Sequence, residues 1–212
     1  SKVYVTSNTP GIESGCAMVA QVELEIGGQL IDRQTEEWMQ IWDELTTPDS
    51  RSFALKAMKC EVSDSAHASG DTITNTGPGL VQIPLNFWFC RNPGLALPLI
   101  ALQYHEVKLK ITWGAAADVG RKAADVSATC QVWVDYIYLD TDERRRFAQV
   151  SHEYLIEQIQ SQTYVGTTAG AKKLNFNHPV KELIWTSPGT NAYKTAKLSL
   201  NGHDRFAEQE EE

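Results

Sequence analysis

The chain has 212 residues, of which 42% are hydrophobic and 22% charged, a composition that is ordinary for a globular protein with a sizeable core. Its formal net charge of −8 argues against a protein that coats nucleic acid, because phosphate binding depends on clustered Lys and Arg side chains. No apolar run approaches the roughly 20 residues of a membrane helix, and no signal peptide opens the sequence, so membrane insertion and signal-directed secretion are not expected.

An antiparallel strand with one buried face is predicted at residues 16–26, where apolar and polar side chains alternate. Gly27 and Gly28 end this strand, and a shorter strand is predicted at residues 2–5. The apolar face of the longer strand holds six residues: Cys16, Met18, Ala20, Val22, Leu24 and Ile26.

A helix is predicted next, and residues 29–33 lead into it. Thr35 is the expected N-cap, and the acidic Glu36 and Glu37 suit the positive end of the helix dipole. Pro48 lies just past the expected end. The apolar stripe of this helix follows the i, i+3, i+4 rule and consists of Trp38, Ile41, Trp42 and Leu45.

Residues 80–113 carry two alternating runs, each of which predicts a strand with one apolar face. Residues 91–94 between them form a turn, in which Pro fixes φ and Gly permits left-handed backbone values. Residues 95–102 are apolar on every side, and we expect them to be buried. The two apolar faces hold Val81, Ile83, Leu85, Phe87 and Phe89 in the first run, and His105, Val107, Leu109, Ile111 and Trp113 in the second.

Residues 128–139 again have strand character, with apolar side chains on both faces. Such a strand is expected to be central in its sheet or covered by another subunit. Asp140 and Glu143 have the spacing of a capping box and predict a short helix or turn through Phe147. Three further strand-like pieces are predicted at residues 154–160, 180–185 and 196–200.

The four cysteines are widely spaced and lack the CxxC or Cys/His spacing of a metal site. Three of them lie in strand-like sequence and are expected in or near the core, which suits a reducing compartment. These three are Cys16, Cys90 and Cys130, and the fourth cysteine is Cys60.

No catalytic or ligand-binding motif interrupts the strand pattern. The sequence contains no HxH of cupin type, no dinucleotide-binding glycine motif, no P-loop and no nucleophile elbow, and its five histidines are isolated from one another: His67, His105, His152, His178 and His203. The triplet Arg144–Arg146 has acidic neighbours and is interpreted as a solvated helix end. We therefore expect no enzymatic activity, no catalytic residues, no cofactor and no metal.

Several stretches resemble the major capsid protein of nucleocytoplasmic large DNA viruses, of the algal-virus and iridovirus type. Residues 87–108 read FWFCRNPGLALPLIALQYHEVK and resemble the signature region of that family. GGQLID followed by WMQIW resembles the family's IGG-x-x-ID motif and the Trp-rich segment after it. Residues 134–160 resemble the junction between the two halves of the family's proteins, and HPVKELIW and KLSLNGHDRF resemble early strands of its second half.

The resemblance implies an all-β double jelly roll, which is a pair of antiparallel β-sandwiches with short helices in the connections. Residues 1–147 would form the first jelly roll without its first strand, and residues 148–212 the junction and the truncated start of the second. The chain opens without Met, so we expect an internal fragment that is incomplete at both ends. A faint internal echo agrees, because VELEIGGQLIDR and AKLSLNGHDRF both contain an amphipathic strand, a glycine and an Asp-Arg pair.

The function implied by the resemblance is that of a structural protein of an icosahedral viral capsid. The expected partners are two further copies in a homotrimer, which forms a pseudo-hexagonal capsomer, then neighbouring capsomers and minor capsid proteins. The shell would overlie an inner membrane without inserting into it, would not touch nucleic acid directly, and would assemble in the host cytoplasm to reside in the virion. The polar loops at residues 63–79 and 114–125 are candidates for outward-facing segments.

Two segments are candidates for contacts between subunits, namely the connection that contains Leu99 and the strand that contains Ile137. A carbohydrate-binding β-sandwich module is the alternative, with Trp38 or Trp133 as the platform for a sugar. Paired Trp residues at helical spacing are nevertheless more often a packing stripe, as we interpret Trp38 and Trp42. A cupin-like enzyme would be a third option and would require a bound metal.

Overall fold

The computed structural model describes residues 3–8, 16–59, 80–114, 130–164, 170–186 and 195–210, with the backbone alone for residues 3–8, 80 and 210. The chain forms two compact units, Ser1–Ile159 and Gln160–Glu212, which are described separately below. Cys60, His67, the loop at residues 63–79 and most of the loop at residues 114–125 lie outside the described residues. The predicted boundary between jelly rolls at residue 147 stays a prediction.

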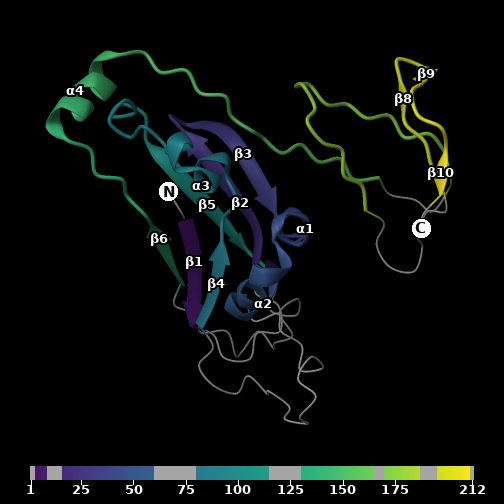
Figure 1. The fold of residues 1–212 in the computed structure, drawn as a ribbon, viewed down its shortest axis with the longest axis horizontal. Coiled ribbons are helices and arrows are strands. Elements are labelled where there is room, and N and C mark those ends of the chain that lie inside the picture. The colour runs from purple at the N-terminus through teal and green to yellow at the C-terminus, as the bar shows by residue number, and fades with distance from the viewer. Residues whose placement is uncertain are drawn as a thin grey trace, which may run out of the picture. The chain divides into compact units, whose positions relative to one another are not determined.

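The first unit contains two three-stranded antiparallel sheets (Figure 1). In one sheet, β1 (Val3–Asn8) lies between β4 (Leu80–Pro84) and β6 (Cys130–Val134). In the other sheet, β2 (Val19–Ile26) lies between β3 (Gln29–Thr35) and β5 (Val107–Trp113). The strands predicted near residues 2–5 and 16–26 are thus the middle strands of the two sheets.

Helices occupy the connections of the first unit. The predicted helix is confirmed as α1 (Glu36–Thr46), and the hydroxyl of its N-cap Thr35 accepts a hydrogen bond from the backbone N–H of Trp38. The capping box of Asp140 and Glu143 is also confirmed, and it opens a helix that continues two residues beyond Phe147. The remaining helices are η1 (Cys16–Met18), α2 (Asp49–Met58), α3 (Trp88–Arg91) and η3 (Pro93–Leu95), beside α4 (Thr141–Gln149).

Residues 29–33 lead into the helix as predicted, but they do so as part of a strand, β3, which was not predicted. Gly27 and Gly28 have φ values of 61° and 81°, the pair of positive values that a two-residue type I′ hairpin loop requires. A tight hairpin therefore brings β3 directly beside β2. The alternation predicted for β2 also changes at its start. The pairing of β2 with β5 has an irregular register between Val19 and Gln21, and the side chain buried there is that of Val19 rather than Ala20.

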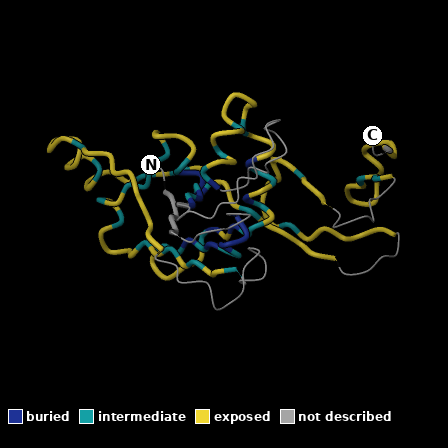
Figure 2. The backbone as a smooth tube through the Cα atoms, turned by 90° about the horizontal axis from the view of Figure 1, so that it is seen from below, coloured by how far each residue is buried: buried dark blue, intermediate teal, exposed yellow. Residues whose placement is uncertain are grey.

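One core joins the two sheets of the first unit (Figure 2). The five apolar residues of the first alternating run are all at most 4% exposed, as predicted. The strand itself ends at Pro84, and the chain turns into α3, so Trp88 is buried beside Phe89 although the two have opposite parity. Fully burying each large apolar side chain contributes about 1.5–3 kcal/mol. The core includes Val22, Leu24, Met39, Val81, Ile83, Leu85, Phe87, Trp88 and Phe89.

Four packing predictions are wrong. Residues 95–102 are half-buried or exposed, with Leu99 46% exposed, because η3 and the turns after it run along the surface. The residue Gly94 keeps a negative φ, and the turn is instead fixed by the Asn92 side chain, which accepts a hydrogen bond from the N–H of Gly94 at 2.9 Å.

In α1 the buried residues are Met39 and Asp43, while Leu45 of the predicted stripe is 65% exposed. Cys130 is exposed, because β6 lies at a sheet edge.

The second unit has four two-residue strands among its described residues: β7 (Thr195–Ala196), β8 (Ser199–Leu200), β9 (His203–Asp204) and β10 (Gln209–Glu210). The pairs are β7 with β10 and β8 with β9. The strands predicted at residues 154–160 and 180–185 are not formed. Asn201 and Gly202 connect β8 to β9 with φ values of 52° and 77°, so this hairpin repeats the loop class of the first unit, in agreement with the sequence echo.

None of the described residues of the second unit is buried, and this suggests a prediction about the 212-residue polypeptide on its own. We expect it to aggregate or to stay partly disordered beyond about Thr163, because the exposed strand edges and apolar side chains have no cover. Light scattering and size-exclusion chromatography test this expectation, and a monodisperse monomer that melts cooperatively would contradict it. The exposed apolar residues are Tyr164, Leu174, Val180, Ile184, Trp185, Leu200 and Phe206.

Candidate functional site

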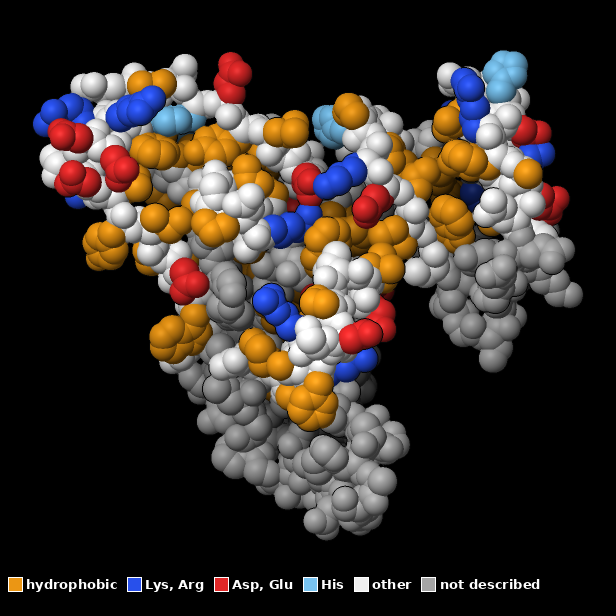
Figure 3. Space-filling view, in the orientation of Figure 1, with side chains coloured by type: hydrophobic (Ala, Val, Ile, Leu, Met, Phe, Trp, Pro, Cys, Tyr) orange, Lys and Arg blue, Asp and Glu red, His pale blue; other side chains and the backbone are white. Residues whose placement is uncertain are grey.

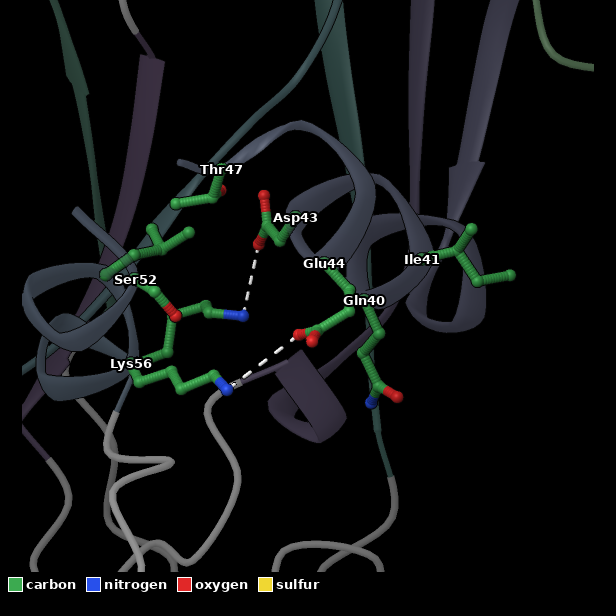
Figure 4. A pocket seen from close by; sticks show the side chains of 9 residues that line it. Gln40, Ile41, Asp43, Glu44, Thr47, Ser52 and Lys56 are labelled. Carbon is green, nitrogen blue, oxygen red and sulfur yellow. Dashed lines mark ion pairs between the residues drawn. The ribbon is translucent and has the colours of Figure 1, made fainter. Parts of the chain in front are cut away.

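A hollow of about 430 Å³ lies between α1 and α2 (Figure 4). Side chains of both helices line it, and Asp43 and Glu44 reach from α1 toward α2. The ammonium group of Lys56 lies 3.8 Å from Glu44, and that of Lys59 lies 3.1 Å from Asp43. Both lysines of the hollow are therefore neutralised by carboxylates of the neighbouring helix, an arrangement that holds α2 against α1.

The pair of Lys59 and Asp43 belongs to a buried polar network. The two side chains are only 4% and 11% exposed. Asp43 also accepts a hydrogen bond from the amide of Asn86 at 3.0 Å, and the Lys59 ammonium lies 3.6 Å from the sulfur of Cys16. Because α2 itself buries none of its residues, Lys59 at its C-cap is the residue that attaches this helix to the interior.

Trp38 and Trp42 of α1 are half-buried and contact each other, although the buried face of the helix is that of Met39 and Asp43. The rings of Trp38 and Trp42 lie 5.8 Å apart at an interplanar angle of 33°. The guanidinium of Arg91 lies over the Trp42 ring, 3.7 Å from its centroid, in a cation–π contact. Arg91 thus covers one face of Trp42, whereas the sugar platform considered from the sequence in α1 is Trp38, which is half-buried beside Trp42. Trp133, the other candidate, is 59% exposed.

An exposed apolar strip covers residues 130–138, at the edge strand β6 and just after it. All nine residues are exposed, so the predicted central position of this strand is wrong, whereas its predicted cover by another subunit is not tested. Figure 3 shows hydrophobic side chains on the surface at the side of the first unit where β6 lies. The large ones in the strip are Val132, Trp133, Val134, Tyr136, Ile137 and Tyr138.

His152 and Asp32 are two titratable side chains that make local contacts. The ring of His152 stacks on Phe147 with centroids 4.9 Å apart, and one of its nitrogens lies 2.9 Å from the Phe147 carbonyl. Burial raises the pKa of the Asp32 carboxyl above its ordinary value, while hydrogen bonds from the backbone N–H groups of Ile159 and Arg33 act in the opposite direction. Within the described ranges, no group of three or more His, Cys, Asp or Glu side chains could hold a metal ion.

In the second unit, an exposed ion pair perturbs both of its members. The Lys197 ammonium lies 2.6 Å from the Asp204 carboxylate, which raises the pKa of Lys197 and, together with a hydrogen bond from Ser199, lowers the pKa of Asp204.

The buried network of Lys59 and Asp43 was not predicted from the sequence. The two residues lie on different helices, one of which was itself not predicted, and an acidic residue within an amphipathic helix ordinarily faces solvent. The only available signal was the placement of Asp43 on the same side of the helix as Met39, at i and i+4.

Family comparisons match most of the chain. Residues 3–140 match a family described as "Major capsid protein N-terminus", and residues 143–191 match one described as "Large eukaryotic DNA virus major capsid protein". Among the residues that the structure describes, no helix has the length and apolar character needed to cross a membrane.

Individual relatives carry the same description. The major capsid protein of Pyramimonas orientalis virus is 48% identical over 216 residues, which covers 95% of this chain and 52% of the relative. That of Phaeocystis pouchetii virus is 41% identical and covers 89% of this chain and 43% of the relative. This chain therefore spans about half the length, or less, of these two relatives.

A solved structure gives the same result. A chain of the PBCV-1 virus capsid superimposes with a TM-score of 0.73 and 30% sequence identity, covering 99% of this chain and 63% of that chain.

The Lys59 network leads to a prediction for the full-length protein. Lys59→Met should lower the free energy of unfolding of the α1–α2 region by about 3 kcal/mol, because it leaves the Asp43 carboxylate buried without its counter-charge. Hydrogen exchange of the α1 and α2 amides measures this change. The double variant Lys59→Met/Asp43→Leu should regain most of the loss.

Lys56→Met is the matched control, because it removes the longer and more exposed ion pair with Glu44. We expect a change below about 0.5 kcal/mol for it. Equal effects of Lys56→Met and Lys59→Met would contradict the assignment of the buried pair as the attachment of α2.

Proposed function

Because this chain belongs to the major capsid proteins of large eukaryotic DNA viruses, we propose that it is part of a subunit of an icosahedral viral capsid and that its role in the virion is structural. The observation that carries this proposal is the family match over residues 3–140, joined by a relative that is 48% identical over 95% of this chain. The resemblance stated from the sequence motifs is confirmed by the same matches.

We infer a double jelly roll for the complete protein, with residues 1–147 in the first roll and residues 148–212 in the junction and the start of the second. Two antiparallel sheets that share one core support a β-sandwich in the first unit. The repeated type I′ hairpin, at Gly27-Gly28 and at Asn201-Gly202, supports a second roll built like the first. The similarity to the PBCV-1 virus capsid chain supports the same fold.

The exposed apolar surfaces would form the contacts between subunits in the assembled capsid. Three copies would form a pseudo-hexagonal capsomer, and capsomers would contact one another and minor capsid proteins in a shell over an inner membrane. Contacts within a trimer resemble obligate interfaces, which are large and apolar, whereas contacts between capsomers can be modest because the lattice repeats them. The apolar strip and the connection around Leu99 are our candidates for trimer contacts.

A non-enzymatic role fits the polar side chains that the structure describes. The lysines of the hollow between α1 and α2 are paired with carboxylates, and His152 stacks on Phe147. The Lys59 ammonium also lies 3.6 Å from the Cys16 sulfur, but both residues are buried, which fits a structural contact. The net charge of −8 is likewise unsuited to direct contact with nucleic acid. Assembly in the host cytoplasm is part of the same proposal, and the wide spacing of the four cysteines along the sequence fits a reducing compartment.

Charging the candidate contacts tests the assembly proposal in the full-length protein. We expect Leu99→Asp and Ile137→Asp to block folding or trimerisation, because a carboxylate would be desolvated without a partner in an apolar interface. Leu45→Asp is the matched control, since Leu45 is 65% exposed on α1, outside both candidate segments. Size-exclusion chromatography and electron microscopy report the outcome, and normal trimers from both interface variants would refute this placement.

A carbohydrate-binding module remains the second candidate function, and the 59% exposure of Trp133 is the observation that favours it. The capsid proposal expects Trp133 to be covered in the trimer and expects no glycan binding that depends on it. A glycan array with wild type and Trp133→Ala decides between the two. Binding by the wild type that is lost in the variant would support the carbohydrate-binding module instead.

A further inference from the structure

A short segment after α4 is held against the first unit by three polar contacts. The backbone N–H of Ile159 donates a hydrogen bond to Oδ1 of Asp32 at 3.0 Å. The side-chain amide of Gln158 donates to the backbone carbonyl of Ile31, and the carboxylate of Glu157 forms an ion pair with Arg91. We call residues 157–159 the strap.

Apolar packing contributes little to this attachment. None of residues 150–159 is buried, and Leu155 and Val150 are 90% and 53% exposed. The strap also forms no strand, although its sequence predicts one, because side chains take the place of a neighbouring strand's backbone as hydrogen-bond partners. The three polar contacts therefore carry most of the attachment.

Asp32 is the strongest of the three contacts on physical grounds. Its residue is only 4% exposed, and its Oδ1 accepts a second hydrogen bond, from the backbone N–H of Arg33 at 2.9 Å. Hydrogen bonds are strengthened where water is excluded. The side chains of Arg91 and Glu157 are 24% and 44% exposed, so water and salt weaken their attraction.

We propose that Asp32 is the anchor that docks residues 157–159 on the first unit, so that the hairpin of β2 and β3 determines where the chain leaves this unit. The strap requires the acceptor oxygen of Asp32 rather than its charge, because both backbone N–H groups meet the same atom. Asp32 is thus a positioning residue for the connecting segment. The proposal concerns the fold alone and does not depend on capsid assembly.

Hydrogen exchange of the full-length protein, followed by mass spectrometry on peptides within residues 150–160 at neutral pH, tests the anchor. Asp32→Ala should speed exchange of the strap by about tenfold or more, because the backbone N–H of Ile159 would lose its acceptor. Asp32→Asn keeps an oxygen at the Oδ1 position and should exchange within about threefold of wild type. Asp204→Ala is the matched control. Asp204, like Asp32, follows a type I′ hairpin loop and precedes an arginine, but its carboxylate contacts Lys197 and Ser199 instead.

A second pair of variants leaves the buried carboxylate intact and decides the question if Asp32→Ala does not fold. Ile159→Pro removes the donor N–H itself and should speed exchange of residues 155–158 as Asp32→Ala does. Glu153→Pro introduces proline into the same exposed segment away from the anchor and should not. The proposal is overturned if a folded Asp32→Ala or Ile159→Pro protein exchanges like wild type. It is also overturned if Glu157→Gln, which weakens the ion pair with Arg91, matches the effect of Asp32→Ala.

Discussion

Burial of apolar side chains between the two sheets is the interaction on which the first unit depends. Val22 and Leu24 come from the middle strand of one sheet, and Val81 and Ile83 come from an outer strand of the other. Along β2 and β4 buried side chains alternate with half-buried ones, so each of these two strands turns one face toward the shared core. The helices α1, α3 and η1 add residues to the same core, whereas α2 and α4 bury none of their own residues.

Two buried carboxylates attach the elements that the core does not reach. Asp43 receives Lys59 from the end of a helix that buries none of its own residues, and Asp32 receives the backbone of a segment without secondary structure. Charges are costly in an apolar interior unless they are paired or hydrogen-bonded, so each of these sites tolerates one arrangement of its partners. Specificity of placement, more than added stability, is the physical gain from such groups.

Alternation of apolar residues predicted which side chains are buried better than it predicted where strands begin and end. It identified Val81, Ile83, Leu85, Phe87 and Phe89 as buried, although the strand stops at Pro84, but it missed Trp88, because strand parity no longer applies in α3. The capped ends at Thr35 and Asp140 were predictable since capping depends on neighbours in sequence. The buried contacts of Lys59 and Asp32 were not predictable, because their partners are far away in sequence. The exposure of residues 95–102 was not predictable either, because an apolar segment is expected to be covered and this chain does not cover it.

Arg91 shows how an exposed position can resist substitution. Its guanidinium stacks on Trp42, pairs with Glu157, and donates from Nε to the backbone carbonyl of Asn86 at 3.1 Å. A planar guanidinium with several donors in fixed directions can make these three contacts at once, whereas the compact ammonium of a lysine could not make all three together. We therefore expect few other residues at position 91 among related sequences, even though its exposure alone would predict that substitutions are tolerated there.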